Sequence, residues 1–307
     1  MTNNPSENKP KLINRLALPI FIGFFVLLAV YSREYKEAII GGIKISCLTV
    51  IPAVFPFFVL ADLLQTYSCG AKKDSKICKI LNISATSRTS VLIGLTCGFP
   101  LGVKCITELY AKKSISKDEY ERLCLYLNNP SAAFVISGVG MGLLGSIKIG
   151  ILLYLSVILS ALLIGFYLGT KSKEIHNAGE ISRQSFDFAT SIKNAGLSSM
   201  YLSSFIIFFS CINGIFKKII KGSLFLCLFA VFSEIGNSVV LIGSNIAFSL
   251  YQKFTLLSFA LGFSGFSVIM QSFALLPKEI SRKRIILYKF IQGMLCTAIS
   301  TLLFVFI

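Results

Sequence analysis

An apolar stretch of the chain, residues 92–110, is interrupted by residues that could expose main-chain atoms to a solute. It reads LIGLTCGFPLGVKCITELY, and its interruption consists of Gly98, Phe99, Pro100 and Gly102. Proline lacks an N–H and disfavours helix at the residue before it, while glycine permits an unwound backbone with no side chain to block a ligand. Unpaired main-chain groups at membrane depth are tolerated only against protein or a wet cavity. The interruption therefore predicts two half-helices beside a solute site.

Two ionisable side chains follow this interruption. Lys104 and Glu108 lie four residues apart, so they share one face of a helix and can form an ion pair. A half-helix that restarts near Leu101 would direct the positive end of its dipole toward the interruption, with Lys104 one turn away. Such a helix start predicts a site for a carboxylate or a similar anion. The alternatives are a neutralised pair that only packs the bundle, or side chains that extend to the membrane surface.

Other polar groups inside apolar segments follow the same reasoning. The sequence LNNP carries Asn128 and Asn129 directly before a proline, and SEIGN carries Glu234 and Asn237 three residues apart on one helical face. An ionisable group at membrane depth costs roughly 2.5–3.5 kcal/mol to insert, and so it indicates function. The structural alternative is an interhelical loop with a helix cap for LNNP, and cross-helix packing for SEIGN. The ionisable residues that we assign to apolar segments are Lys44, Asp62, Lys104, Glu108 and Glu234.

The composition predicts that these groups lie on membrane helices. The chain is 54% hydrophobic and only 14% charged, and its mean hydropathy is +0.76. Runs such as residues 149–169 approach the roughly 20 residues with which a helix crosses a hydrocarbon layer of about 30 Å. The net charge of +16 arises mostly in short loops between apolar runs, which is typical of membrane helices beside anionic lipid. We therefore expect an all-α polytopic membrane protein that contacts the lipid bilayer and no nucleic acid.

Catalytic and metal-binding motifs are missing from the sequence. Nine cysteines are scattered without a CxxC pair, and the one histidine, His176, lies in a polar loop. Neither a Cys/His metal cluster nor a disulfide framework is expected from this pattern. An intramembrane enzyme with a Ser–Lys dyad is the alternative, but no strained serine motif accompanies Lys104. We expect no catalytic residue, no metal and no cofactor.

Basic and polar loops divide the chain into apolar segments. Segments 37–66 and 119–143 contain prolines and could be re-entrant, so eight or nine membrane segments are expected. The predicted segments are 16–31, 37–66, 88–112, 119–143, 147–168, 196–216, 223–243, 255–275 and 285–306.

The longest polar stretch, residues 170–194, separates two halves that share motifs. The predicted organisation is a tail with a first, uncleaved membrane helix (1–36), a first repeat (37–169), a polar connecting loop (170–194) and a second repeat (195–307).

The shared motifs suggest that the second half repeats the first. GFPLGV (98–103) is answered by GFSGFS (262–267), which adds Gly262, Gly265 and Ser267 to the candidate site. LNNPSAAF is answered by SEIGNSVV, and IPAVFPFFVLADLL loosely by SSFIIFFSCINGIF. Inverted repeats with helices broken at matching positions are typical of secondary transporters. Close helix packing alone can also produce glycine-rich membrane segments.

Four stretches together resemble a known family: IPAVFPFFVLADLL, GFPLGVKCITELY, SKDEYERLCLYLNNPSAAFVISGVGMGLLGS and GFSGFSVIMQ. They are similar to the sporulation integral membrane proteins of endospore-forming bacteria, the YlbJ type, over about residues 37–300. That family carries paired nucleoside-recognition or Gate domains, which resemble concentrative nucleoside transporters. The resemblance implies two Gate-like repeats, in a bacterial membrane of the inner type. It also implies a transporter made in the mother cell, located in the outer forespore membrane, with dipicolinic acid as its solute.

Transport of a small anionic solute is thus the leading hypothesis. Nucleoside-type transport is one alternative, and a non-transporting assembly or signalling protein needed for spore formation is another. The expected partners are the anionic solute and the lipid bilayer, with a second copy of the chain or other sporulation membrane proteins as further candidates. The candidate substrate-binding residues are Gly98, Phe99, Pro100, Gly102, Lys104, Asn128, Asn129, Glu234, Asn237, Gly262, Gly265 and Ser267.

Overall fold

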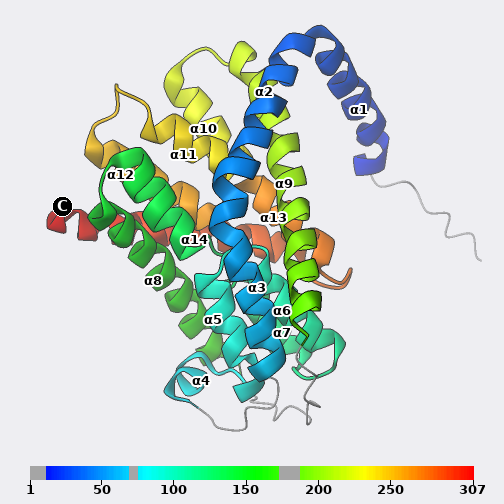
Figure 1. Cartoon of the computed structure of the whole chain (residues 1–307), viewed down its shortest axis with the longest axis vertical. Coiled ribbons are helices and arrows are strands. Elements are labelled where there is room, and N and C mark those ends of the chain that lie inside the picture. The colour runs from blue at the N-terminus through cyan, green and yellow to red at the C-terminus, as the bar shows by residue number, and fades with distance from the viewer. Residues whose placement is uncertain (1–11, 69–74, 173–186) are drawn as a thin grey trace, which may run out of the picture.

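A computed structural model describes residues 12–68, 75–172 and 187–307, and these residues form helices and connecting turns without a strand (Figure 1). The all-α prediction is confirmed for this part of the chain. His176, most of the N-terminal tail and the middle of the predicted connecting loop lie outside the described residues.

The helices follow the predicted apolar segments closely. Those of the first half are α1 (Leu12–Val30), α2 (Ser32–Ile45), the π-helix η1 (Ser46–Val50), α3 (Ile51–Ser68), α4 (Lys76–Leu81), the 3-10 turn η2 (Ala85–Ser87), α5 (Arg88–Thr96), α6 (Leu101–Ala111), α7 (Lys117–Cys124), the π-helix η3 (Phe134–Leu143) and α8 (Ile147–Lys171). Those of the second half are α9 (Phe188–Ile219), α10 (Ser223–Ser233), α11 (Ile235–Gly243), α12 (Leu250–Phe263), α13 (Gly265–Leu275), α14 (Arg282–Leu303) and the 3-10 turn η4 (Phe304–Phe306).

Five stretches of helix in the described residues are long and apolar enough to cross a membrane. The expectation of eight or nine membrane segments stays a prediction, because several segments consist of two short helices. The five stretches are Ser32–Thr66, Ile147–Lys171, Phe188–Ile219, Leu250–Leu275 and Arg282–Phe306.

The two halves of the chain repeat one order of elements. Each begins with a long helix, which is α2–η1–α3 in the first half and α9 in the second. A hairpin of two short helices that pack together follows. It is α5–α6 in the first half, after the short α4 and η2 that have no counterpart in the second half, and α10–α11 in the second. An interrupted helix and a second long helix complete each half, namely α7–η3 with α8, and α12–α13 with α14. By this order of elements, GFPLGV in the first hairpin corresponds to SEIGN in the second hairpin. The comparison of sequence motifs instead pairs GFPLGV with GFSGFS.

The long first helices of the two halves lie side by side and run antiparallel (Figure 1). A Cβ added to Gly42 of α2 would stand 2.9 Å from the Ser210 Cβ of α9. Further along α3, the Asp62 carboxylate accepts hydrogen bonds from Ser191 Oγ at 2.8 Å and Asn194 Nδ2 at 3.2 Å. Residue numbers rise along one helix as they fall along the other, so the two helices are antiparallel. Small residues at the contact permit the close approach. Asp62 is therefore a structural link between the halves.

Glycines also pack each interrupted helix against the long helix that follows it. A Cβ at Gly262 of α12 would stand 2.9 Å from the Gly293 Cα of α14, and one at Gly150 of α8 would stand 3.0 Å from the Gly140 Cα of η3. Gly262, which we predicted in the solute site, thus belongs to a helix–helix contact. Small residues are found at such contacts because lipid offers no hydrophobic drive for helix association.

Candidate functional site

The tip of the first hairpin forms at the predicted interruption. Helix α5 ends at Thr96, α6 begins at Leu101, and Gly98 between them has a φ of +94°, a backbone conformation that glycine adopts without strain. Gly102 has a different role from the predicted one. A Cβ on it would stand 2.6 Å from the Gly94 Cα, so Gly102 lets the two arms of the hairpin pack together.

The tip of the second hairpin is Glu234, which precedes α11 in an extended conformation. Its Oε1 accepts from the Gly236 N–H at 2.7 Å, and its Oε2 accepts from the Asn237 N–H at 2.6 Å and from Asn237 Nδ2 at 2.9 Å. These bonds occupy the N–H groups that a helix start leaves unpaired. The α11 start therefore binds a carboxylate of its own chain.

Each hairpin tip lies against the interruption in the helix of its own half. A Cβ added to Gly98 would stand 2.9 Å from the Ser131 Cβ, in the non-helical stretch between α7 and η3. Helix α12 ends and α13 begins at Ser264 and Gly265, whose φ values are +71° and +76°. A Cβ on Gly265 would stand 3.2 Å from the Glu234 Cα. The two hairpin tips and the two interrupted helices thus form two matching pairs, one in each half.

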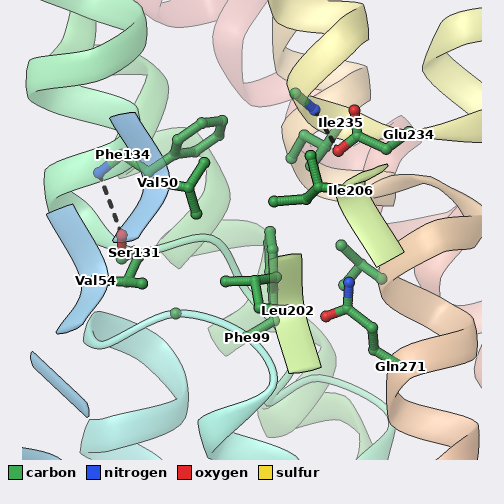
Figure 2. Close-up of a pocket in the computed structure, with 13 residues that line it drawn as sticks. Val50, Val54, Phe99, Ser131, Phe134, Leu202, Ile206, Glu234, Ile235 and Gln271 are labelled. Carbon is green, nitrogen blue, oxygen red and sulfur yellow. Dashed lines mark hydrogen bonds between the residues drawn. The ribbon is translucent and has the colours of Figure 1, made fainter. Parts of the chain in front are cut away.

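A narrow cavity of ≈ 30 Å³ lies where these pairs meet (Figure 2). We call it the central cavity. A cavity of this size has room for a few water molecules, so a larger solute requires its walls to move apart. Both hairpin tips, both interrupted helices and the two antiparallel long helices contribute to its wall. The lining residues are Val50, Val54, Gly98, Phe99, Ser131, Phe134, Leu202, Ile206, Glu234, Ile235, Gly236, Val268 and Gln271.

Gln271 of α13 is the polar side chain of the cavity without a protein partner. It is fully buried, and neither its amide nitrogen nor its amide oxygen has a hydrogen-bond partner in the described residues. Figure 2 shows its amide end directed into the cavity. A buried unpaired amide costs about 1–3 kcal/mol, so its partner is expected to be a solute or water. Ser131 adds a hydroxyl that accepts from the Phe134 N–H at 3.2 Å and can donate its proton to a solute.

Lys104 does not reach the central cavity, contrary to the anion site that we predicted at the start of α6. Its Nζ donates to Ser198 Oγ of α9 at 3.4 Å, and it is not among the cavity-lining residues. Glu108 is exposed, and in the described residues no ion pair within 4.0 Å joins it to Lys104. The Lys104 side chain therefore turns from the hairpin tip toward α9.

Asn128 and Asn129 lie behind the cavity wall, in a hydrogen-bond network that fixes the non-helical stretch. Asn128 Nδ2 donates to Ser272 Oγ of α13 at 2.8 Å, and Asn129 Nδ2 donates to the Tyr126 carbonyl oxygen at 2.8 Å. Neither lines the cavity. Asn237 Nδ2 likewise donates to Ser210 Oγ, at 3.0 Å.

Among the residues predicted for the site, Gly98, Phe99 and Glu234 line the cavity. Pro100 adjoins them at the hairpin tip, Gly265 touches Glu234, and Ser267 is buried with no partner for its hydroxyl in the described residues.

Two polar side chains that sequence reasoning left out of the site lie at or beside it. Gln271 is one, and Lys289 of α14 is the other. Lys289 is fully buried, and its Nζ donates to the Asn128 carbonyl oxygen and to Gln292 Oε1, each at 2.8 Å. The rule that marks ionisable groups in apolar segments applies to Lys289. Lys289 lies only a few residues after the basic loop at 278–284, so in the sequence it is not distinguished from the lysines and arginines of that loop.

The chain is similar to the sporulation integral membrane protein YlbJ of Bacillus subtilis (strain 168). The two are 24% identical over 338 aligned positions, which cover 95% of this chain and 83% of that protein. No family model and no solved structure matches the chain. The predicted resemblance to the YlbJ-type proteins is confirmed. Together with the apolar helices, this similarity indicates an integral membrane protein.

Proposed function

We propose that this protein carries a small solute across a membrane by alternating access around the central cavity. The observation that carries the proposal is Gln271, a buried amide with no hydrogen-bond partner among the described residues, directed into a cavity where two hairpin tips and two interrupted helices meet. Secondary transporters place their binding sites at interrupted helices near the middle of the membrane, between inverted repeats. The antiparallel long helices and the matched order of elements fit that design.

The solute that we propose is dipicolinic acid, in the outer forespore membrane during sporulation. The YlbJ-type resemblance implies this solute, and the name of the relative supports the setting of sporulation. The chemistry of the cavity is compatible with it. Phe99 and Phe134 provide apolar surface for a flat ring, while Gln271 and Ser131 provide hydrogen bonds for carboxyl groups. The cavity lining contains Glu234 and no basic residue, so recognition would use hydrogen bonds in place of a direct ion pair.

In this mechanism the solute crosses unchanged, and the protein needs no catalytic group. Each hairpin tip would close the cavity from one side, and relative movement of the two halves would open one side at a time. Lipid surrounds the apolar outer surface, and a second copy or other sporulation membrane proteins remain proposed partners.

Uptake by the purified full-length protein tests the proposal. In proteoliposomes, labelled dipicolinate should accumulate above the level in protein-free vesicles, and an excess of unlabelled dipicolinate should reduce the signal. Labelled nucleosides in the same vesicles test nucleoside-type transport. Absence of uptake for both classes, with correctly inserted protein, would favour a non-transporting assembly role.

A further inference from the structure

A buried lysine lies where an ion-coupled transporter would hold its ion. Lys289 is fully buried on α14, and the oxygen atoms around its Nζ belong to neutral groups, the Asn128 main chain and the Gln292 amide. No ion pair within 4.0 Å joins Lys289 to a carboxylate in the part of the chain that the structure describes. An ammonium group has three donors and no acceptor, so such oxygens are suitable partners for it.

The carbonyl group that accepts a hydrogen bond from Lys289 lies at a helix interruption. Asn128 lies a few residues after the C-terminal end of α7, in the non-helical stretch between α7 and η3. In transporters with broken helices, unwound carbonyls and half-helix C-terminal ends are the groups that coordinate Na⁺ or a proton. Here the carbonyl oxygen of Asn128 accepts a hydrogen bond from the Lys289 ammonium group instead.

Lys289 is also linked to both walls of the central cavity. Gln292 Nε2 donates to Asn129 Oδ1 at 2.6 Å, which ties α14 to the stretch that continues to the cavity residue Ser131. Asn128 Nδ2 donates to Ser272, the neighbour of the cavity residue Gln271. A cation at this position both fixes the interruption and places positive charge behind a cavity that lacks a basic lining residue.

We propose that Lys289 is a resident cation, which takes the place of a metal ion that would otherwise have to bind and move together with an anionic solute. The inference rests on the proposed function for its consequence in transport, namely that uptake needs no Na⁺ or K⁺. Lys289 is a positioning residue in this scheme, because it acts through Asn128 and Gln292.

Uptake of labelled dipicolinate in proteoliposomes tests the consequence for transport. With choline in place of Na⁺ and K⁺ on both sides, wild-type uptake should stay within about twofold of its value in NaCl, since no metal site has to be filled. Lys289→Met should lower uptake about tenfold or more in every salt, because the oxygens at the interruption lose their donor. Lys289→Ala should lose uptake in choline and recover part of it with Na⁺ or methylammonium. Lys283→Ala, an exposed lysine on the same helix, is the matched control and should behave as wild type.

Thermal unfolding of the purified protein provides a readout that does not need transport. Lys289→Ala should unfold at a higher temperature in NaCl or methylammonium chloride than in choline chloride, whereas the wild type should show no such difference. This measurement decides the resident-cation inference even if dipicolinate uptake is never observed, a result that would reject the proposed function alone. Wild-type uptake that requires Na⁺, wild-type activity in Lys289→Met, or no cation-specific stabilisation of Lys289→Ala would overturn the inference.

Discussion

Gly265 lies directly against the main chain of Glu234, and a Cβ on Gly265 would stand 3.2 Å from both the Cα and the N of Glu234. This contact joins the second hairpin tip to the interruption of α12–α13. The first half has its counterpart in the contact between Gly98 and Ser131. Both contacts border the central cavity, so they connect the shape of the main chain to solute binding.

Gly265→Ala should impair both folding and transport. Its φ of +76° is unfavourable for alanine by about 1–2 kcal/mol, and the added methyl group would press on Glu234. Gly145→Ala is the control, because Gly145 has a φ of +66° but open space around its Cβ position. Thermal unfolding should show a loss in both variants, while dipicolinate uptake should fall only in Gly265→Ala. Equal uptake in the two variants would show that the contact has no role in transport.

Gln271→Leu should separate binding from stability. Removing a buried amide that has no hydrogen-bond partner in the described part of the chain should leave the free energy of unfolding unchanged or raise it by about 1 kcal/mol. Solute binding should weaken, so added dipicolinate should no longer raise the unfolding temperature. Met270→Leu, an exposed neighbour on the same helix, serves as the control. A loss of stability in Gln271→Leu would instead indicate a structural amide.

Glu234→Ala should destabilise α11 by about 0.5–2 kcal/mol, since the helix start loses its carboxylate cap. Ser249→Ala removes the cap of α12 at an exposed position and should cost a similar amount. Because Glu234 lines the cavity and Ser249 does not, only the first variant should change the uptake rate or its solute preference. Uptake like that of wild type in Glu234→Ala would limit this residue to a structural role.

Lys104→Ala should retain transport within about twofold, since the side chain makes one long hydrogen bond to Ser198 outside the cavity. Uptake kinetics measured beside the Lys289→Met variant provide the comparison. Complete loss of uptake in Lys104→Ala, with normal insertion, would move the anion site from the central cavity to the start of α6.

The helices and the first interruption could be predicted from the sequence because their causes are local. Apolar length sets the membrane segments, and the Gly98 and Pro100 pair cannot continue a helix. The partners of each polar group could not be predicted in the same way. Lys104 and Lys289 are both lysines in apolar segments, yet one turns toward Ser198 and the other is buried against Asn128. That difference depends on which helices become neighbours, and no local rule determines it.

Glu234 is covalently attached two residues before the first N–H group that it binds. A dissolved carboxylate that approaches the α11 start must therefore compete with a tethered one, whose effective concentration reaches the millimolar range or more. Such built-in competition would lower the apparent affinity of this helix start for a dissolved anion. In the proposed carrier, weak binding at this position would favour release of the solute, and turnover depends on release as much as on binding.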